Sequence, residues 1–241
     1  MDLSGRHSEG DAGKEMMISQ ALLTIAGDGA VKREIPGIDC YAERMVGAME
    51  QGDPSFEPAM MGLYLKLHGA GSVYSPSERG ILNRRQGYSC ISGGLDPLIK
   101  AGPYVKTESV VADLGAANGL QGLLLQHLYP HRRTLQIELS SGMIRMGRLF
   151  QNALGINDDR VTWINKDIAD ATLESVDFVY VFRPARPSDS GRDLYRTIAS
   201  KLATVRKPLV VFSVADCLSE FLDEYFSIFY SDGHLTCFSK E

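Results

Sequence analysis

The stretch VVADLGAANG at residues 110–119 decides the fold of this chain, and it runs directly into LQGLLLQHL at residues 120–128. Its first half is apolar and largely β-branched, which predicts a short buried strand. Asp113 and two glycines then interrupt the apolar run, and the leucines that follow have helical spacing. A strand, a glycine-containing turn and a helix in this order are typical of the nucleotide-binding edge of an open α/β sheet.

The glycine spacing separates two classes of nucleotide site. A dinucleotide site uses the pattern G-x-G-x-x-G, because closely placed backbone amides and a helix N-terminus bind the pyrophosphate. Here the glycines are Gly115, Gly119 and Gly122, and Asp113 precedes them. A carboxylate at this point would repel a pyrophosphate but would suit a cationic ligand, bound directly or through water. The structural alternative is an ordinary strand-to-helix turn in which Asp113 caps the helix.

Two further predicted strands also end in acids. Residues 134–138 read as a strand that ends at Glu138, about 20 residues beyond the loop, where such folds place the carboxylate that accepts the ribose hydroxyls. Residues 161–167 read as a third strand that ends at Asp167. Each acid alone is commonly a solvated loop carboxylate or a cap. Three acids at the ends of three successive strands are a much less common coincidence.

This pattern resembles that of the Rossmann-like, seven-strand S-adenosylmethionine-dependent methyltransferases, over roughly residues 104–241. The resemblance implies an α/β fold with a mostly parallel seven-stranded sheet and a C-terminal antiparallel hairpin. It also implies S-adenosylmethionine as the cofactor, with the acid at 167 accepting the adenine amino hydrogens and the next residue packing on the ring. The residues that it assigns to the cofactor are Asp113, Gly115, Ala116, Asn118, Gly119, Glu138, Leu139, Asp167, Ile168 and Phe182.

The C-terminal part of the chain carries a second sign of the same fold. Residues 176–182 form a continuous apolar run typical of a buried parallel strand, residues 193–205 predict a helix, and residues 208–214 predict a fifth strand. Residues 225–230 and 235–238 are two more strand runs, separated by the turn signal Asp232-Gly233. A terminal hairpin distinguishes the methyltransferase sheet from a dinucleotide-binding one.

The chain divides into three predicted parts. Residues 1–14 are polar and rich in glycine and charge, so we expect them to be disordered. Residues 15–103 are expected to form a helical N-terminal segment, with helices over 15–26, 39–51 and 57–68, and residues 104–241 the cofactor-binding domain. The resemblance implies that the helical segment is a lid or shapes the acceptor pocket. The alternative is that the apolar stripe of the helix over 57–68 simply faces the core. This methionine and aromatic stripe consists of Phe56, Met60, Leu63, Tyr64 and Leu67.

The segment Tyr74-Ser75-Pro76-Ser77 has two readings. It is loosely similar to a motif of the seven-strand lysine methyltransferases, in which a tyrosine and a small polar residue lie over the methionine part of the cofactor. Alternatively, it is a proline turn that caps a helix through Ser75 or Ser77.

The acceptor is not identified by any motif. The segment Arg183-Pro184-Ala185-Arg186-Pro187, which the resemblance places opposite the transferable methyl group, lacks the Asn/Asp-Pro-Pro-Tyr tetrad of amide and adenine N-methyltransferases. It also lacks the Pro-Cys pair of cytosine C5 enzymes, so both subclasses are excluded. Arg183 and Arg186 either clamp an anionic acceptor or are surface arginines.

Methyl transfer from a sulfonium mainly requires that the acceptor lone pair be aligned with the methyl carbon and that water be excluded. A base is needed only when the acceptor arrives protonated. No catalytic residue is therefore assigned. The residues considered are Tyr74, Tyr88 and Arg183, with His68 and His234 as further bases. The histidines are scattered, and no metal site is predicted.

Composition sets the remaining expectations. The chain has 241 residues, 44% of them hydrophobic, and a net charge of −5, which predict a soluble globular protein and give no support to nucleic acid as a main partner. A small-molecule or protein acceptor is expected instead. Four widely spaced cysteines (Cys40, Cys90, Cys217 and Cys237) fit a reducing, cytoplasmic location. No stretch resembles a membrane span, and the oligomeric state is left open, including a homo-oligomer.

Two functions from different classes remain at this point. The first is an S-adenosylmethionine-dependent methyltransferase. The second is a non-catalytic binding or regulatory module that keeps the methyltransferase fold. A nicotinamide-dependent dehydrogenase is disfavoured by the glycine spacing, by Asp113 and by the predicted hairpin.

Overall fold

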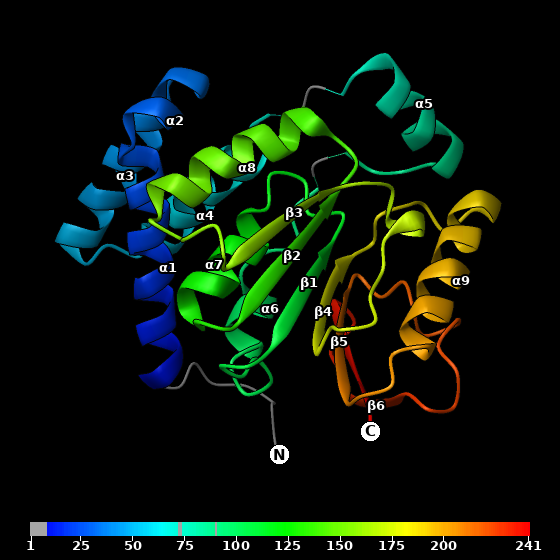
Figure 1. Cartoon of the computed structure of the whole chain (residues 1–241). Helices are drawn as coiled ribbons and strands as arrows, with labels where there is room; N and C mark the ends of the chain where they lie inside the picture. The colour runs from blue at the N-terminus through cyan, green and yellow to red at the C-terminus, as the bar shows by residue number, and fades with distance from the viewer. Residues whose placement is uncertain (1–8, 72–73, 90) are drawn as a thin grey trace.

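A seven-stranded sheet in the order β3-β2-β1-β4-β5-β7-β6 lies at the centre of the molecule (Figure 1). This computed structural model describes residues 9–71, 74–89 and 91–241. The strands are β1 (Val110–Leu114), β2 (Arg133–Glu138), β3 (Val161–Asn165), β4 (Phe178–Phe182), β5 (Leu209–Val214), β6 (Ser227–Ser231) and β7 (Leu235–Lys240). The α-helices are α1 (Glu9–Gly27), α2 (Gly29–Glu34), α3 (Ile38–Gln51), α4 (Phe56–His68), α5 (Pro76–Arg85), α6 (Asp96–Lys100), α7 (Leu120–Leu128), α8 (Ser141–Ala153) and α9 (Asp189–Ala203).

The pairing of the strands confirms the predicted sheet. β1 pairs in parallel with β2 and β4, β2 with β3, and β4 with β5. β7 is antiparallel to both β5 and β6, so the C-terminal hairpin inserts its second strand next to β5. The chain leaves β1 for β2 on one side and returns to β4 on the other. The carboxyl ends of β1 and β4 therefore flank the topological switch point, where open α/β sheets bind ligands.

Burial on both faces explains why β1 reads as a continuous apolar run. All five of its residues are buried. Val111 belongs to the core under α1 and α7, whereas Ala112 and Leu114 belong to the core under α9. Figure 1 shows α9 on the opposite side of the sheet from these two helices. Asp113 points to the same side as Val111, because successive side chains of a strand alternate between faces.

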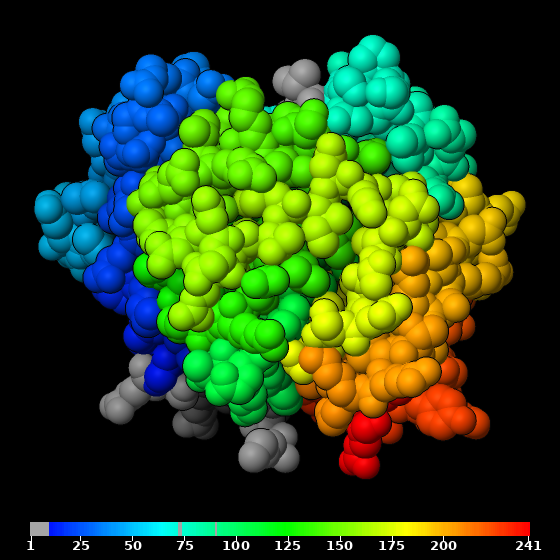
Figure 2. Space-filling model, viewed as in Figure 1, coloured from blue at the N-terminus to red at the C-terminus, as the bar shows by residue number. Residues whose placement is uncertain are grey.

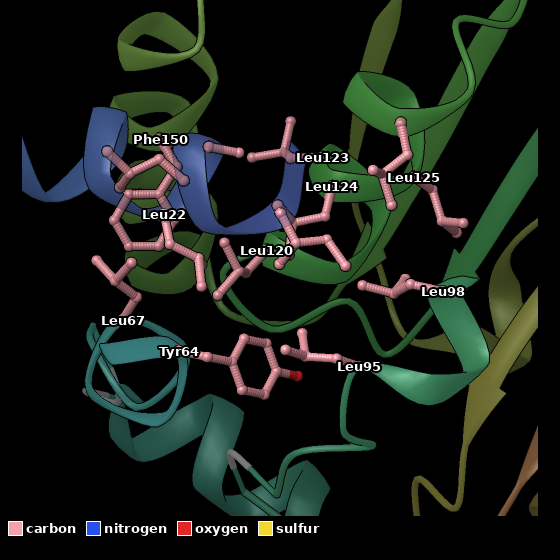
Figure 3. Close-up of a cluster of buried hydrophobic side chains, with 14 of the residues drawn as sticks. Leu22, Tyr64, Leu67, Leu95, Leu98, Leu120, Leu123, Leu124, Leu125 and Phe150 are labelled. Carbon is pink, nitrogen blue, oxygen red and sulfur yellow. The ribbon is translucent and has the colours of Figure 1, made fainter. Parts of the chain in front are cut away.

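Helix α7 is surrounded by apolar side chains on nearly all sides (Figure 3). Its leucines pack against Leu22 of α1, Tyr64 and Leu67 of α4, and Leu98 of α6. A helix that is apolar around its circumference is buried rather than exposed on one face. The N-terminal helices thus form the outer layer that covers α7, and their methionine and aromatic stripe faces the core.

The N-terminal boundary differs from the prediction. Helix α1 begins at Glu9, so residues 9–14, which we expected to be disordered, are helical, while residues 1–8 lie outside the described part of the chain. The helix continues inward to Ile18, Leu22 and Ile25, which are fully buried. Burial of this inner half against α7 extends order into a polar first turn that has little helical signal of its own.

The structure confirms the capping reading of the Tyr74–Ser77 segment; Ser72 and Val73 before it lie outside the described residues. The Ser75 hydroxyl accepts a hydrogen bond from the Glu78 N–H (3.3 Å), and Glu78 Oε2 accepts one from the Ser75 N–H (2.6 Å). This reciprocal pair starts α5, with Pro76 in its first turn. Glu78 Oε1 also accepts from the backbone N–H of Ser141 (2.9 Å) and so joins α5 to the start of α8.

The third strand is shorter than predicted. β3 ends at Asn165, and Asp167 is instead the N-cap of a short 3₁₀ helix at Ile168–Asp170, where its Oδ1 accepts from the Ala169 N–H (2.9 Å). An Asp side chain bonds readily to the backbone two residues further on, which favours a turn over extension of the strand.

Neither a membrane-spanning helix nor a disulfide occurs within residues 9–71, 74–89 and 91–241. No helix there is long and apolar enough to cross a bilayer. Cys40, Cys217 and Cys237 are free thiols, and Cys90 lies outside the described residues.

Gly147 of α8 should not tolerate a side chain, because a Cβ there would lie 2.1 Å from the Trp163 ring and 2.5 Å from the Asn118 carbonyl oxygen. We expect Gly147→Ala to lower the free energy of unfolding by about 1–3 kcal/mol through overpacking. Gly47→Ala in α3 is the matched control, since nothing lies within 4 Å of its added Cβ. That control should raise the free energy of unfolding by about 0.5–1 kcal/mol. Urea denaturation measures both, and equal effects would contradict this account of helix packing.

Candidate functional site

A cavity of about 100 Å³, open to solvent, lies at the carboxyl ends of β1, β2 and β4 and beneath α5. Eight of the ten residues that the sequence assigned to the cofactor line it: Asp113, Gly115, Ala116, Glu138, Leu139, Asp167, Ile168 and Phe182. The other two are Asn118 and Gly119, and neither is part of the wall.

The loop after β1 is folded back tightly over the end of β2. The N–H groups of Gly115 and Ala116 both donate to the carbonyl oxygen of Ile137 (3.0 Å each). Gly115, Ala117 and Gly119 have positive φ angles of 77°, 52° and 68°, so the chain reverses direction within a few residues. The cavity wall at this point is therefore bare backbone, which lets a ligand approach closely.

Asn118 and Gly119 hold the loop through contacts with neighbouring elements and do not line the cavity themselves. The Asn118 amide donates to the carbonyl oxygens of Leu67 (2.8 Å), His68 (3.0 Å) and Ala70 (3.1 Å), and so fixes the end of α4 against the loop. Gly119 is the N-cap of α7, and a Cβ there would lie 2.3 Å from the Trp163 ring. Both residues therefore act on the cavity through the backbone that they hold.

Two buried acids face the cavity from β1 and β2. Asp113 is 3% exposed, and its Oδ2 accepts from the Gly122 N–H (3.2 Å). Glu138 is 5% exposed and accepts from the N–H groups of Ala117 (2.9 Å) and Ser140 (2.7 Å). Burial raises the pKa of each carboxyl to about 7, more than the hydrogen bonds lower it. The site thus concentrates negative charge where solvent does not stabilise it.

The inner end of the cavity is polar, and sequence reasoning missed most of it. His68, Gln121 and Tyr180 line it. The Gln121 amide donates to the Tyr64 hydroxyl (2.6 Å), the Gly94 carbonyl (2.8 Å) and the Tyr180 hydroxyl (3.3 Å). The available signals were a glutamine among the leucines of α7 and a tyrosine within the apolar run of β4.

At this inner end Oε1 of Gln121 is buried with no hydrogen-bond partner among the described residues. The imidazole of His68 is also buried, and a backbone hydrogen bond with Ile91 acts on it. Burial lowers the pKa of His68, so its imidazole is neutral, and the ring stacks on Tyr64 with the centroids 5.8 Å apart. Buried polar atoms are rarely left unpaired in native proteins. Gln121 and His68 both line the cavity, so this unpaired oxygen lies at the cavity wall.

The structure places some of the residues considered for catalysis in the cavity wall and others outside it. Tyr74, Tyr88, Arg183 and His68 line the cavity. His234 does not, and its Nε2 lies 3.1 Å from the Gly93 carbonyl oxygen. Arg183 Nη2 donates to the Asp216 carbonyl (3.1 Å). The Arg186 guanidinium lies 6.0 Å from the centroid of the Tyr88 ring. No set of three or more His, Cys, Asp or Glu side chains in the described ranges could hold a metal ion.

Helix α5 and the segment after it form the roof of the cavity. Arg85 Nε lies 3.4 Å from Asp167 Oδ2, so the end of the helix reaches the opposite wall. The following residues, 86–88, are paired with residues 184–186 of the β4–α9 connection, with a β-bridge between Gly87 and Ala185. We call residues 86–88 the strap. The roof could not be predicted, because it depends on contacts about a hundred residues apart.

The buried Asp113 carboxyl should make stability depend on pH. Its folded pKa of about 7 exceeds the usual value of 3.8, so the folded state binds more protons than the unfolded state between these values. The free energy of unfolding should therefore fall as pH rises from about 4 to 7 and stay at its lower value above pH 7. Asp113→Asn removes the charge and keeps an acceptor for Gly122. We expect this variant to be about 1–3 kcal/mol more stable than the parent at pH 8, with a smaller gain at pH 5.5.

Urea unfolding at the two pH values tests this prediction, with Glu50→Gln as the control for loss of a carboxylate at an exposed position. An Asp113→Asn variant no more stable than the parent at pH 8 would show that burial of the carboxylate carries no penalty.

Comparison with known proteins gives similarity in fold only. No protein-family model matches the chain, and no curated protein matches it. Among solved structures, it is similar to a conserved hypothetical protein from Streptococcus pyogenes (15% identity, 61% of this chain and 94% of that chain, TM-score 0.48). It is also similar to TrmN from Thermus thermophilus (15% identity, 61% and 48% of the two chains, TM-score 0.49).

A third similar structure is geranyl diphosphate C-methyltransferase from Streptomyces coelicolor, determined with S-adenosyl-L-homocysteine (15% identity, 49% and 43% of the two chains, TM-score 0.40). Identities this low carry no information about substrate. The fold is established by the strand order and the hairpin: the chain has the Rossmann-like seven-stranded α/β fold of S-adenosylmethionine-dependent methyltransferases.

Proposed function

We propose that this protein binds S-adenosylmethionine in the cavity beneath α5 and transfers the methyl group to an acceptor. One observation carries the proposal. Asp113, Glu138 and Asp167 follow three different strands, and all three line one cavity at the switch point of the sheet. The cofactor has an adenine, a ribose and a cationic amino-acid end, and the three acids lie on or just after the adjacent strands β1, β2 and β3.

The outer part of the cavity suits the adenine. Leu139 and Ile168 provide apolar surface for the ring, and the side chain of Ile168 approaches Gly115. Asp167 uses Oδ1 to cap the 3₁₀ helix, which leaves Oδ2 to accept the amino hydrogens once Arg85 moves aside. The Arg85–Asp167 contact, at 3.4 Å and partly exposed, is a weak interaction that a ligand can replace.

The middle of the cavity suits the ribose. Each Glu138 carboxylate oxygen accepts one backbone N–H, from Ala117 or from Ser140, and each retains a second lone pair. Those backbone hydrogen bonds already fix the position of the carboxylate. Binding two ribose hydroxyls would therefore cost little additional side-chain conformational entropy.

The inner end suits the amino-acid part of the cofactor. Asp113 and Gln121 Oε1 are acceptors that fit an ammonium group. The neutral His68 imidazole and the Tyr180 hydroxyl can donate to a carboxylate. An ionic ligand here would satisfy Gln121 Oε1, which lacks a partner among the described residues, and its positive charge would offset the cost of ionising Asp113.

When bound, the cofactor supplies a methyl group on a sulfonium centre. Asp113, Glu138 and Asp167 would hold the cofactor while an acceptor atom bonded to that carbon, and the electron pair of the broken sulfur–carbon bond would stay on sulfur. The contribution of the chain is to orient the two reactants and to exclude water beneath α5. Nothing in the site favours the non-catalytic module, which would bind the cofactor without turnover.

Calorimetric titration with S-adenosylhomocysteine tests the cofactor, with NAD as the negative control. We expect Asp167→Ala to weaken binding by about 1–3 kcal/mol, or roughly 5- to 150-fold, because the adenine amino group loses its acceptor. Asp170→Ala is the matched control, since Asp170 lies three residues away and does not line the cavity. Unchanged affinity in Asp167→Ala would show that the adenine does not bind beside Asp167.

A second titration tests the inner end separately. 5′-Methylthioadenosine lacks the amino-acid part, so the ratio of its dissociation constant to that of S-adenosylhomocysteine reports on this end alone. We expect His68→Phe to lower this ratio by about 10- to 150-fold, as expected for the loss of a hydrogen bond to a charged group, while the affinity for 5′-methylthioadenosine stays unchanged. A variant that weakens both ligands equally would mean that His68 acts only on the fold of the cavity.

A further inference from the structure

We propose, on the basis of the function above, that the methyl acceptor is a small, largely apolar molecule enclosed in the cavity, and not a side chain or base of a macromolecule. The proposal concerns the acceptor half of the cavity, which we define by Tyr88, Ile91, Arg183, Pro184 and Leu194. Two independent observations support it: the closure of this half from above, and the chemistry of its walls.

The strap closes the path over the end of β4. The Tyr88 N–H donates to the Pro184 carbonyl (3.0 Å), and the Arg186 N–H donates to the Gln86 carbonyl (3.0 Å). The Ser188 hydroxyl also donates to the Gln86 side chain. These bonds make a short antiparallel pair between the strap and the β4–α9 connection. A polymer acceptor would have to break this pair to lie across the end of the strand.

Helix α5 is also held at both of its ends. Its first turn is bonded to α8 through Glu78 Oε1 and the Ser141 N–H (2.9 Å), and its end continues into the strap, which is paired with residues 184–186. The helix packs against α9, and Figure 2 shows their surfaces in contact at one side of the molecule. The roof is thus joined to the rest of the fold at several points, and a polymer would have to displace it to reach the acceptor half.

The walls of the acceptor half are mostly apolar. Leu194 is 4% exposed, and Pro184 and the Tyr88 ring continue the same surface. Most of the charged side chains in the described lining belong to the cofactor half: Arg85, Asp113, Glu138, Lys166 and Asp167. The remaining one, Arg183, donates to the Asp216 carbonyl. A site of this kind gains affinity from apolar surface, whereas nucleic acids are held mainly through cationic contacts to phosphates.

Ile91 offers a way to fill the acceptor half without disturbing the cofactor half. Its side chain is 48% exposed at the rim of the cavity, so a larger residue should not disrupt the core. We expect Ile91→Trp to lower the rate of methyl transfer by at least about tenfold, because the indole occupies the space of the acceptor. Its affinity for S-adenosylhomocysteine should stay within about twofold of the parent. Ile228→Trp is the matched control and should retain both properties, because Ile228 is 57% exposed and does not line the cavity.

The decisive measurement uses S-adenosylmethionine with tritium in the methyl group and a native-cell extract separated by ultrafiltration into small molecules and macromolecules. We expect label to enter compounds of the small-molecule fraction that partition into organic solvent, and to be lost with Ile91→Trp. Label in precipitated protein or nucleic acid, or in neither fraction, would overturn the proposal. If the parent protein does not bind S-adenosylhomocysteine, the proposed function itself fails, so the two failures are distinguishable.

Discussion

The loop from Gly115 to Gly119 is the constraint on which the rest of the site depends, because it is held from two directions at once. Asn118 bonds it to three carbonyl groups at the end of α4, and the absence of side chains at Gly119 and Gly147 lets the Trp163 ring and α8 approach it. The N-terminal helices and the sheet therefore meet at this loop. A change in either layer would move the backbone that forms the cavity wall.

The electrostatics of the cavity oppose stability. Two carboxyl groups are buried within one cavity, and their pKa values are raised by desolvation despite backbone hydrogen bonds to each. In a structural site such acids would be replaced readily by amides, which accept the same bonds without the cost of charge. Their placement at the ends of β1 and β2 fits a binding site in which a cationic ligand offsets the penalty. Oε1 of Gln121 fits the same interpretation, because it is buried at the cavity without a hydrogen-bond partner among the described residues, and such atoms are rarely left unpaired.

The sequence predicted those parts of the structure that follow from local patterns. Apolar runs located the strands, and the Asp232-Gly233 turn located the hairpin, because both signals depend on neighbouring residues. The boundaries were less accurate: Asp167 ends β3 two residues early by capping a 3₁₀ helix, and α1 extends outward to Glu9. The polar inner end was not predicted, since Gln121 and Tyr180 are 59 residues apart and their contact arises only when α7 packs on the sheet. The capping interpretation of the Tyr74–Ser77 segment is confirmed by Ser75 at the start of α5, and the similarity to the lysine methyltransferase motif stays a prediction, with Tyr74 in the cavity wall.

The roof illustrates why the acceptor is harder to read from sequence than the cofactor. The acids that we propose to bind the cofactor must have a particular chemistry, and that chemistry is visible in the sequence. The strap requires only a conformation: Gln86 ends α5 with a φ of +50°, and this turn brings Gly87 beside Ala185. At Gly87 a Cβ would lie 2.8 Å from the Leu82 side chain and 3.5 Å from the Pro184 carbonyl oxygen. Gln86 and Gly87 thus set the conformation of the strap, and the strap closes the acceptor half of the cavity from above. Substitutions at the strap can therefore alter the choice of acceptor while the residues facing the cofactor remain the same.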